Sequence, residues 1–211
     1  MTLKGWENIA WHLSWKAKNI ISYPDHTSSN AGRVPGLLHL SFSNVGNKSK
    51  KVELIFTDAP GEWFGQWKIN QNHLQAEGAR WIHQHSDIFL LFADGEKFSG
   101  QEKGKARRDL IELIDRLAVE NKKPLGLVWA KSDNKISKEI KEALRTSLEN
   151  SSIKSTQEFE ISALEVKYHD NILKVMSWVL QEVQKIRSEP IKLSTPPSSE
   201  ETNFFLLKRN Y

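Results

Sequence analysis

The 211-residue sequence predicts an α/β fold in which a mostly parallel sheet carries helices on both faces. Three short apolar segments, 88–93, 125–130 and 158–162, have the length and composition of buried strands, and a helical pattern follows each of them. Strands and helices that alternate in this way form right-handed crossovers, which make the strands parallel. Ligands bind such sheets at the loops beyond the carboxyl ends of the strands, so functional residues are expected there.

The first third of the chain predicts a helix, a long loop and a hairpin. Apolar residues recur at helical spacing over 6–20, whereas 22–36 holds two prolines, two glycines and many small polar residues, which is typical of an exposed loop. Apolar and polar residues then alternate over 38–43, and a second strand follows at 52–57. A turn at 46–48 separates the two strands, so we expect an antiparallel hairpin at the edge of the sheet.

Two further helices complete the prediction. One is expected over 67–85, and the clearest runs over 172–186, where seven apolar residues form one continuous stripe. The remaining sequence is rich in Pro, Ser and Glu and ends in a short apolar stretch. We therefore expect one folded domain over 1–187, followed by a flexible linker and an apolar anchor over 188–211.

Composition restricts the class of protein. The sequence has no cysteine, which excludes disulfides, thiolate nucleophiles and Cys-type zinc sites. Its longest uninterrupted apolar run, 88–93, is far shorter than the ~20 residues of a membrane-spanning helix, and no signal-type segment opens the chain. We therefore expect a cytoplasmic protein without a membrane partner. The formal net charge of +4 is spread along the chain, so we do not expect nucleic acid as its main partner.

An acidic motif follows the second predicted strand. Asp58 stands at the strand end and Gly61 three residues later. A carboxylate in this position can hold Mg²⁺ through water, and glycine lets a backbone N–H approach a terminal phosphate. Taken alone, the Asp-Ala-Pro-Gly sequence also fits an ordinary turn.

Two more motifs stand at later strand ends. After 125–130 come Lys131 and Asp133: the carboxylate can accept both N–H donors of a guanine edge while the lysine stem packs over the base plane. The next strand ends in Ser162, Ala163 and Leu164, where small residues permit backbone contact with a base carbonyl. Lys-Ser-Asp also fits a helix cap. The order of the three motifs favours one guanine-nucleotide site over three unrelated turns.

Further segments extend the pattern beyond these motifs. They are 3–7, 24–27, 35–40, 58–64, 78–81, 106–108 and 128–133. With them the chain resembles the translation-factor-related (TRAFAC) P-loop GTPases, and within these the double-GTPase families of bacterial conflict and signalling systems. The resemblance covers about residues 2–180. It implies a Ras-like sheet that binds GTP and Mg²⁺ and in which Lys131 and Asp133 select guanine.

The resemblance also implies roles at the phosphate end of the nucleotide. Thr27 would lie in the first switch, where its hydroxyl binds Mg²⁺. Asp58 would hold the same ion through water and, with Gly61, sense the γ-phosphate. Glu62 is the candidate for orienting the attacking water.

No Gly-x-x-x-x-Gly-Lys-[Ser/Thr] phosphate loop occurs in the sequence. The nearest match, 99–106, has Ser for the first Gly and Ala where the hydroxyl belongs, and it follows Asp58 instead of preceding it. In the resembling families the first strand and this loop stand upstream of what is Met1 here, so we expect an N-terminally truncated domain that lacks both. The missing strand is central, and its slot needs an occupant. The apolar residues 203–207 are one candidate, and docking of these residues on helices or a partner is the alternative.

Three functions remain open at this point. The first is a GTP-binding, GTPase-like switch that acts on a protein partner in a multi-component system, with hydrolysis only if a phosphate loop is supplied upstream or in trans. The alternative is a pseudo-GTPase that serves as an interaction module without hydrolysis. A basic accessory protein that binds nucleic acid is the third.

Overall fold

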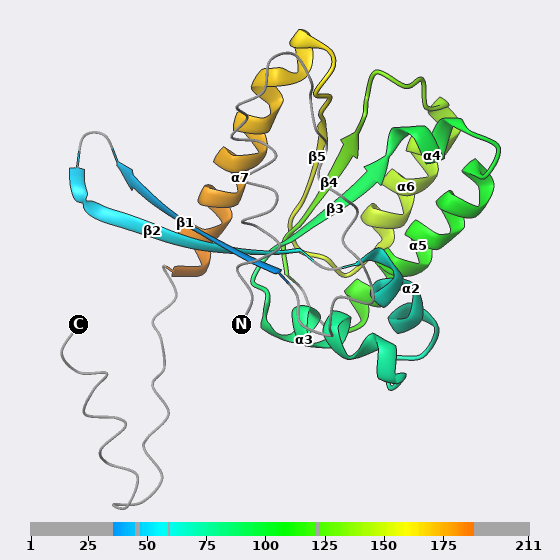
Figure 1. The fold of residues 1–211 in the computed structure, drawn as a ribbon, viewed down its shortest axis with the longest axis horizontal. Coiled ribbons are helices and arrows are strands. Elements are labelled where there is room, and N and C mark those ends of the chain that lie inside the picture. The colour runs from blue at the N-terminus through cyan, green and yellow to red at the C-terminus, as the bar shows by residue number, and fades with distance from the viewer. Residues whose placement is uncertain (1–35, 45–46, 59, 121–122, 188–211) are drawn as a thin grey trace, which may run out of the picture.

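The computed structural model describes residues 36–44, 47–58, 60–120 and 123–187 (Figure 1). The elements are β1 (Gly36–Asn44), β2 (Asn47–Asp58), α2 (Gly61–Ile69), η1 (Leu74–Ala76), α3 (Glu77–His85), β3 (Phe89–Asp94), α4 (Gly95–Ser99), α5 (Lys103–Glu120), β4 (Leu125–Ala130), α6 (Lys138–Asn150), β5 (Thr156–Glu160), η2 (Val166–Tyr168) and α7 (His169–Arg187). The predicted opening helix, nearly all of the loop after it, and the linker and anchor lie outside the described residues.

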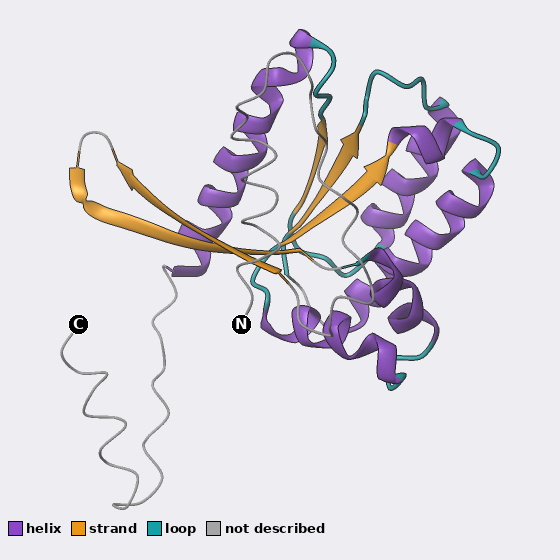
Figure 2. Ribbon diagram, viewed as in Figure 1, coloured by secondary structure: helices purple, strands orange, loops and turns teal. Residues whose placement is uncertain are grey.

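The strands form two sheets (Figure 2). Strands β3, β4 and β5 are parallel and lie in that order, with Phe89 beside Leu125 and Leu125 beside Thr156. Strands β1 and β2 pair antiparallel, with Leu40 opposite Leu54. The α/β class, the parallel strands and the hairpin are therefore confirmed. The structure differs from the prediction of one sheet, because in the described part of the chain no strand joins β2 to β3.

Helices cover both faces of the parallel sheet because β4 alternates its side chains between two cores. Leu125, Leu127 and Trp129 pack into one core with residues of α5 and α6, whereas Val128 packs into the other with Trp178 of α7. All five residues from Leu125 to Trp129 are buried. An apolar segment without a polar face is stable only between two helix layers, which is how the sequence determines this architecture.

The hairpin belongs to the α7 side of the molecule. Leu54 of β2 is 7% exposed and lies in the same core as Phe159 and Val175. Burying a side chain of this kind stabilises the fold by about 1.5–3 kcal/mol.

The predicted helix over 67–85 is wrong as a single element. It consists of α2 and α3 with η1 between them. The break falls where the Asn70 side chain accepts a hydrogen bond from the Asn72 N–H at 3.0 Å, a local bond that competes with the helical backbone. Helix α2 also begins earlier, at Gly61 after Pro60, whose φ of −55° suits the residue before a helix.

Several strand bounds differ from the prediction. Strand β2 begins at Asn47, five residues before the predicted start, so 47 and 48 belong to the strand and not to the predicted turn. Two smaller differences concern the site. Strand β3 ends one residue later, at Asp94, and β5 ends two residues earlier, at Glu160. Asp94 therefore closes a strand, and Ser162 lies in the loop beyond one. None of the helices in the described ranges is long and apolar enough to cross a membrane.

Candidate functional site

The loop after β4 is a tight turn held by local hydrogen bonds. Lys131 has a φ of 52°, in the left-handed region that residues with a side chain adopt rarely. The Asn134 N–H donates to the Lys131 carbonyl at 2.9 Å, and the Ser132 hydroxyl donates to the Trp129 carbonyl at 2.7 Å. These bonds fix the backbone that carries Lys131 and Asp133.

A side-chain hydrogen bond joins this loop to the loop after β5. Ser162 Oγ donates to Asp133 Oδ1 at 2.5 Å and accepts from the Leu164 N–H at 3.1 Å. Ser162 is only 2% exposed, so these two bonds satisfy a hydroxyl that water cannot reach easily. The other carboxylate oxygen, Oδ2, accepts a long bond of 3.4 Å from the Asn134 side chain. The hydrogen bond from Ser162 fixes the orientation of the Asp133 carboxylate.

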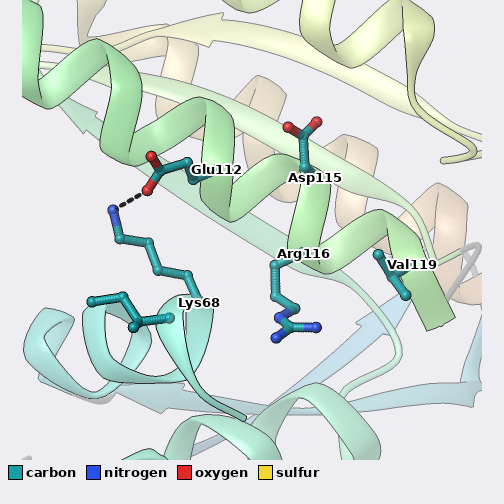
Figure 3. Close-up of a pocket in the computed structure, with 6 residues that line it drawn as sticks. Lys68, Glu112, Asp115, Arg116 and Val119 are labelled. Atoms are coloured by element: carbon teal, nitrogen blue, oxygen red, sulfur yellow. Dashed lines mark hydrogen bonds and ion pairs between the residues drawn. The ribbon is translucent and has the colours of Figure 1, made fainter.

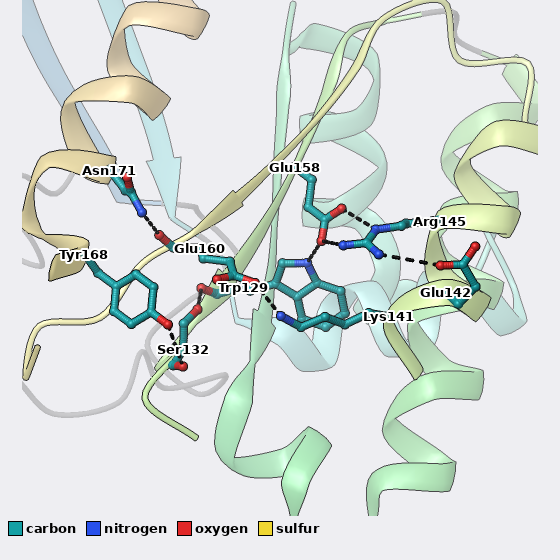
Figure 4. Close-up of polar contacts among 9 residues, drawn as sticks. All are labelled: Trp129, Ser132, Lys141, Glu142, Arg145, Glu158, Glu160, Tyr168 and Asn171. Carbon is teal, nitrogen blue, oxygen red and sulfur yellow. Dashed lines mark hydrogen bonds and ion pairs between the residues drawn. The ribbon is translucent and has the colours of Figure 1, made fainter. Parts of the chain in front are cut away.

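Backbone bonds continue the pairing of β4 and β5 past the strand ends. The Ile161 N–H donates to the Trp129 carbonyl at 2.8 Å, and the Ser132 N–H donates to the Ile161 carbonyl at 3.0 Å. The Tyr168 hydroxyl adds a bond of 3.3 Å to the Ser132 carbonyl (Figure 4). The structure therefore brings together the predicted residues of both loops, Lys131, Asp133, Ser162, Ala163 and Leu164.

A network of charged side chains supports these loops from the α6 side (Figure 4). Trp129 is completely buried, and its indole N–H donates to Glu158 Oε1 at 2.5 Å. Arg145 of α6 donates to both oxygens of the same carboxylate, at 2.7 and 2.9 Å. Lys141 pairs with Glu160, and its ammonium lies 5.4 Å from the centre of the Trp129 ring. The last residues of β4 and β5 are thus tied to one helix.

The charge of Glu158 depends on these partners. Partial burial alone would raise its pKa, but the hydrogen bonds from Arg145 and Trp129 outweigh burial and lower the pKa below its ordinary value of 4.5. Glu158 is therefore ionised when the network forms, and the bidentate bond with Arg145 is charge-assisted on both sides.

The Lys131 side chain reaches across to the end of β3. Its Nζ lies 3.2 Å from Asp94 Oδ2 and 2.8 Å from Glu96 Oε2. The hydrogen bond to Glu96 raises the pKa of Lys131, against a smaller opposing effect of burial, and Asp94 adds to the increase. The Lys131 ammonium is therefore charged and is held by two carboxylates at the carboxyl edge of the parallel sheet.

The predicted phosphate-end residues lie in another part of the fold. Gly61 and Glu62 are exposed at the start of α2, which packs against α3 and α5 rather than at the ends of β4 and β5 (Figure 1). Asp58 closes β2 opposite Gly36, and its side chain lies outside the described set, as does Thr27 altogether. Among the described residues no hydrogen bond or ion pair joins the start of α2 to the loop of Asp133, so one shared pocket stays a prediction.

A shallow cavity of about 330 Å³ lies between α2 and α5, and none of the predicted site residues lines it (Figure 3). Lys68 lines it and forms ion pairs with Asp109 at 2.5 Å and Glu112 at 2.7 Å. Partial burial lowers the pKa of Lys68, but the two carboxylates reverse this and raise it. Arg116 lies 5.7 Å from the centre of the Trp67 ring. The cations of this cavity are engaged with neighbours that hold α2 on α5.

Sequence reasoning did not include Asp94, Glu96 or the network around Glu158. A signal existed for the first two, because Asp94 directly follows an apolar strand and precedes a glycine, as Asp58 nearly does. Glu158 gave no such signal, since its partner Arg145 is 13 residues away on a different element.

The described residues do not by themselves form a Mg²⁺ site. Across the described ranges no group of three or more His, Cys, Asp or Glu side chains is placed to hold a metal ion. Mg²⁺ keeps several waters and is usually bound by one or two protein oxygens together with substrate phosphates. Asp58 and Thr27 would be protein ligands of that kind.

The fold is that of an α/β protein, with the candidate site in the loops at the carboxyl edge of a parallel sheet. Comparison with family models shows that the chain belongs to the Double-GTPase 2 family, whose model matches residues 1–179. No curated protein matches the chain. Eleven solved chains match, among them translation elongation factor SelB from Methanococcus maripaludis in complex with the GTP analogue GppNHp, with a TM-score of 0.40 and 17% identity. The match covers 78% of this chain and 30% of SelB.

Proposed function

We propose that this chain is a GTP-binding, GTPase-like switch protein of the TRAFAC class that acts on a protein partner in the bacterial cytoplasm. The observation that supports it most strongly is the Asp133 carboxylate, which is oriented by Ser162 beside Lys131 at the adjoining ends of β4 and β5. Membership of the Double-GTPase 2 family supports the same nucleotide.

The chemistry of guanine explains why this arrangement would select it. The guanine edge presents two adjacent N–H donors, at N1 and at the C2 amino group, whereas adenine has an acceptor nitrogen at N1 and a C–H at C2 and so presents neither donor. Each carboxylate oxygen has two lone-pair positions, so the bond from Ser162 leaves Asp133 able to accept from both donors. The Lys131 stem would pack on the base plane, and the backbone N–H of Ala163 would meet the base carbonyl, while that of Leu164 stays bonded to Ser162.

At the other end of the nucleotide, Thr27 and Asp58 would hold Mg²⁺ through a hydroxyl and a water. Gly61 would admit the γ-phosphate, and Glu62 would orient water. Mg²⁺ would supply charge neutralisation at the phosphates. Loss of the γ-phosphate would then release the segments around Thr27 and Gly61, which is how such a switch signals to its partner.

A second function is favoured by one specific observation. The 211 residues contain no Gly-x-x-x-x-Gly-Lys-[Ser/Thr] sequence, the element that neutralises the β- and γ-phosphates. A pseudo-GTPase that binds guanine nucleotide without hydrolysing it would fit this sequence, as would a GTPase that receives a phosphate loop from another segment or protein. Binding without phosphate release would distinguish the pseudo-GTPase.

Asp133→Asn tests the proposed function. The wild-type chain should bind GDP in preference to XDP. Guanine has an amino group at C2 that can donate to the Asp133 carboxylate, whereas xanthine has a carbonyl there. In the variant the new amide N–H₂ faces a donor in guanine but a carbonyl in xanthine, so the preference should move toward XDP by at least tenfold, equivalent to ~1.4 kcal/mol. Isothermal titration with both nucleotides and Mg²⁺ measures this.

Asp115→Asn is the matched control, since Asp115 is exposed on α5. It should leave both affinities unchanged. A retained GDP preference in Asp133→Asn, with an intact thermal transition, would contradict guanine selection by this carboxylate.

A further inference from the structure

The end of β3 contacts the base loop through backbone as well as side chains. Asp94 is the last residue of β3 and pairs in register with Ala130, the last of β4. A Cβ built on Gly95 would lie 2.8 Å from the Ala130 carbonyl oxygen and closer still to that of Lys131, so the two backbones approach within a distance that only glycine permits. The loop after β3 is therefore in direct contact with the loop that carries Lys131.

The two carboxylates beside Gly95 have separate tasks. Asp94 Oδ1 accepts the Glu96 N–H at 3.0 Å and so caps α4, while Oδ2 faces Lys131 Nζ at 3.2 Å. Glu96 places its own carboxylate 2.8 Å from the same ammonium. One lysine thus has two anionic partners, and both come from a single short segment.

These ion pairs are too exposed to serve mainly as a stability device. The Lys131 side chain is 50% exposed and that of Glu96 73%. Pairs of this kind contribute little to folding because water screens them. They do, however, restrict a side chain that would otherwise sample many rotamers, and a ligand that packs on a restricted side chain does not bear the entropy cost of ordering it.

We propose that Asp94 and Glu96 are positioning residues that hold the Lys131 side chain as one wall of the guanine pocket. With its ammonium anchored at the end of β3, the four-carbon stem lies fixed at the carboxyl edge of the sheet and presents an apolar face to the base. The inference rests on the proposed function, and it extends the base site from two strand ends to three.

The experiment is a double-mutant cycle on nucleotide affinity. Asp94→Asn with Glu96→Gln removes both charges but keeps an acceptor for the α4 cap, and it should weaken GDP binding about three- to tenfold. Lys131→Met keeps an apolar stem of similar length without the ammonium. In the Lys131→Met background the two carboxylate substitutions should have no further effect, because the anchored group is gone.

Glu53→Gln is the control for loss of a surface carboxylate. Glu53 is exposed on the hairpin, where it is hydrogen-bonded to His39, so its substitution should leave GDP affinity unchanged. The difference in GDP affinity between the wild type and the Asp94→Asn, Glu96→Gln variant should also become smaller as the salt concentration is raised, because salt screens the attraction between exposed charges.

Each other outcome overturns a defined part of the proposal. An equal loss in the wild-type and Lys131→Met backgrounds, or no loss at all, overturns the positioning role while guanine selection by Asp133 stands. Failure of the wild-type chain to bind GDP, together with no response of Asp133→Asn to XDP, overturns the proposed function and this inference with it.

Discussion

The base end and the phosphate end of the candidate site are built in different ways. At the base end, side-chain hydrogen bonds join residues at or beside three strand ends: Lys131 to Asp94, Ser162 to Asp133, and Trp129 to Glu158. At the phosphate end, Gly61 and Glu62 are exposed at the start of α2. The loops at the proposed base end are therefore held in place by their own contacts, whereas Gly61 and Glu62 of the proposed phosphate end take their positions from the packing of α2.

Because of this difference, substitutions at the two ends of the candidate site should affect folding and ligand binding to different extents. Changes to the buried contacts at the base end should alter both folding and ligand binding, whereas changes to the exposed ion pairs of Lys131 should alter mainly ligand binding. Changes at the phosphate end should have little effect on folding and act mainly on the phosphates.

The largest effect is expected for Gly95→Ala. The new methyl group would meet the carbonyl oxygens of Ala130 and Lys131, which are backbone atoms and cannot rotate away. Overpacking of this kind costs about 1–3 kcal/mol, so the free energy of unfolding should fall by that amount in urea titrations. GDP affinity should fall as well, because the contact displaces the loop that carries Lys131.

Gly65→Ala is the matched control for the same added methyl group. Gly65 lies inside α2, and a Cβ there has no atom within 4 Å. Alanine has the higher helix propensity, so this variant should be more stable by up to about 1 kcal/mol. Equal stability of the two variants would show that the close approach at Gly95 is not a real constraint.

The sequence allowed the base end to be predicted because each of its signals is local. A strand followed by Lys131 and Asp133, and a later strand followed by Ser162, are patterns within ten residues each. Parallel strands place such ends at one edge, so the meeting of the two loops followed from the fold class. The Asp94 contact could have been found by the same rule.

Other features depend on pairings that no local pattern contains. Glu158 finds Arg145 on α6 and Trp129 on β4 only after the chain has folded. The prediction of one helix over the polar, Trp-containing stretch 67–85 missed the break between α2 and α3, which falls where the Asn70 side chain accepts a hydrogen bond from the Asn72 N–H. The separation of the hairpin from the parallel sheet is likewise a property of strand neighbours and not of strand patterns.

A smaller, pH-dependent effect is expected for Glu158→Gln. The substitution removes the charge that Arg145 pairs with but keeps an acceptor for the Trp129 indole, so we expect a loss of about 1–2 kcal/mol at neutral pH. The pKa of Glu158 is lowered in the folded state, so the carboxylate stabilises the fold above its ordinary pKa of 4.5. That stabilisation is lost as pH falls through the lower folded value.

Urea titrations at neutral pH and at about pH 3 measure this dependence, and the difference between wild type and Glu158→Gln should narrow at the acid pH. Glu142→Gln is the control, because Glu142 contacts the same arginine at 3.5 Å from an exposed position. A pH-independent difference would mean that Glu158 acts through packing and not through its charge.

The smallest effect on stability is expected for Glu62→Ala, and this result would sharpen the contrast between the two ends. Glu62 is exposed in the first turn of α2, where a negative charge interacts favourably with the helix dipole. Its removal should change the free energy of unfolding by only about 0.5 kcal/mol and leave GDP affinity within twofold. If a phosphate loop is present, any effect of the substitution on GTP hydrolysis would be detected by measuring single-turnover phosphate release from GTP. A loss of stability as large as that of Gly95→Ala would instead make Glu62 part of the folded framework, and the phosphate end would then be as preorganised as the base end.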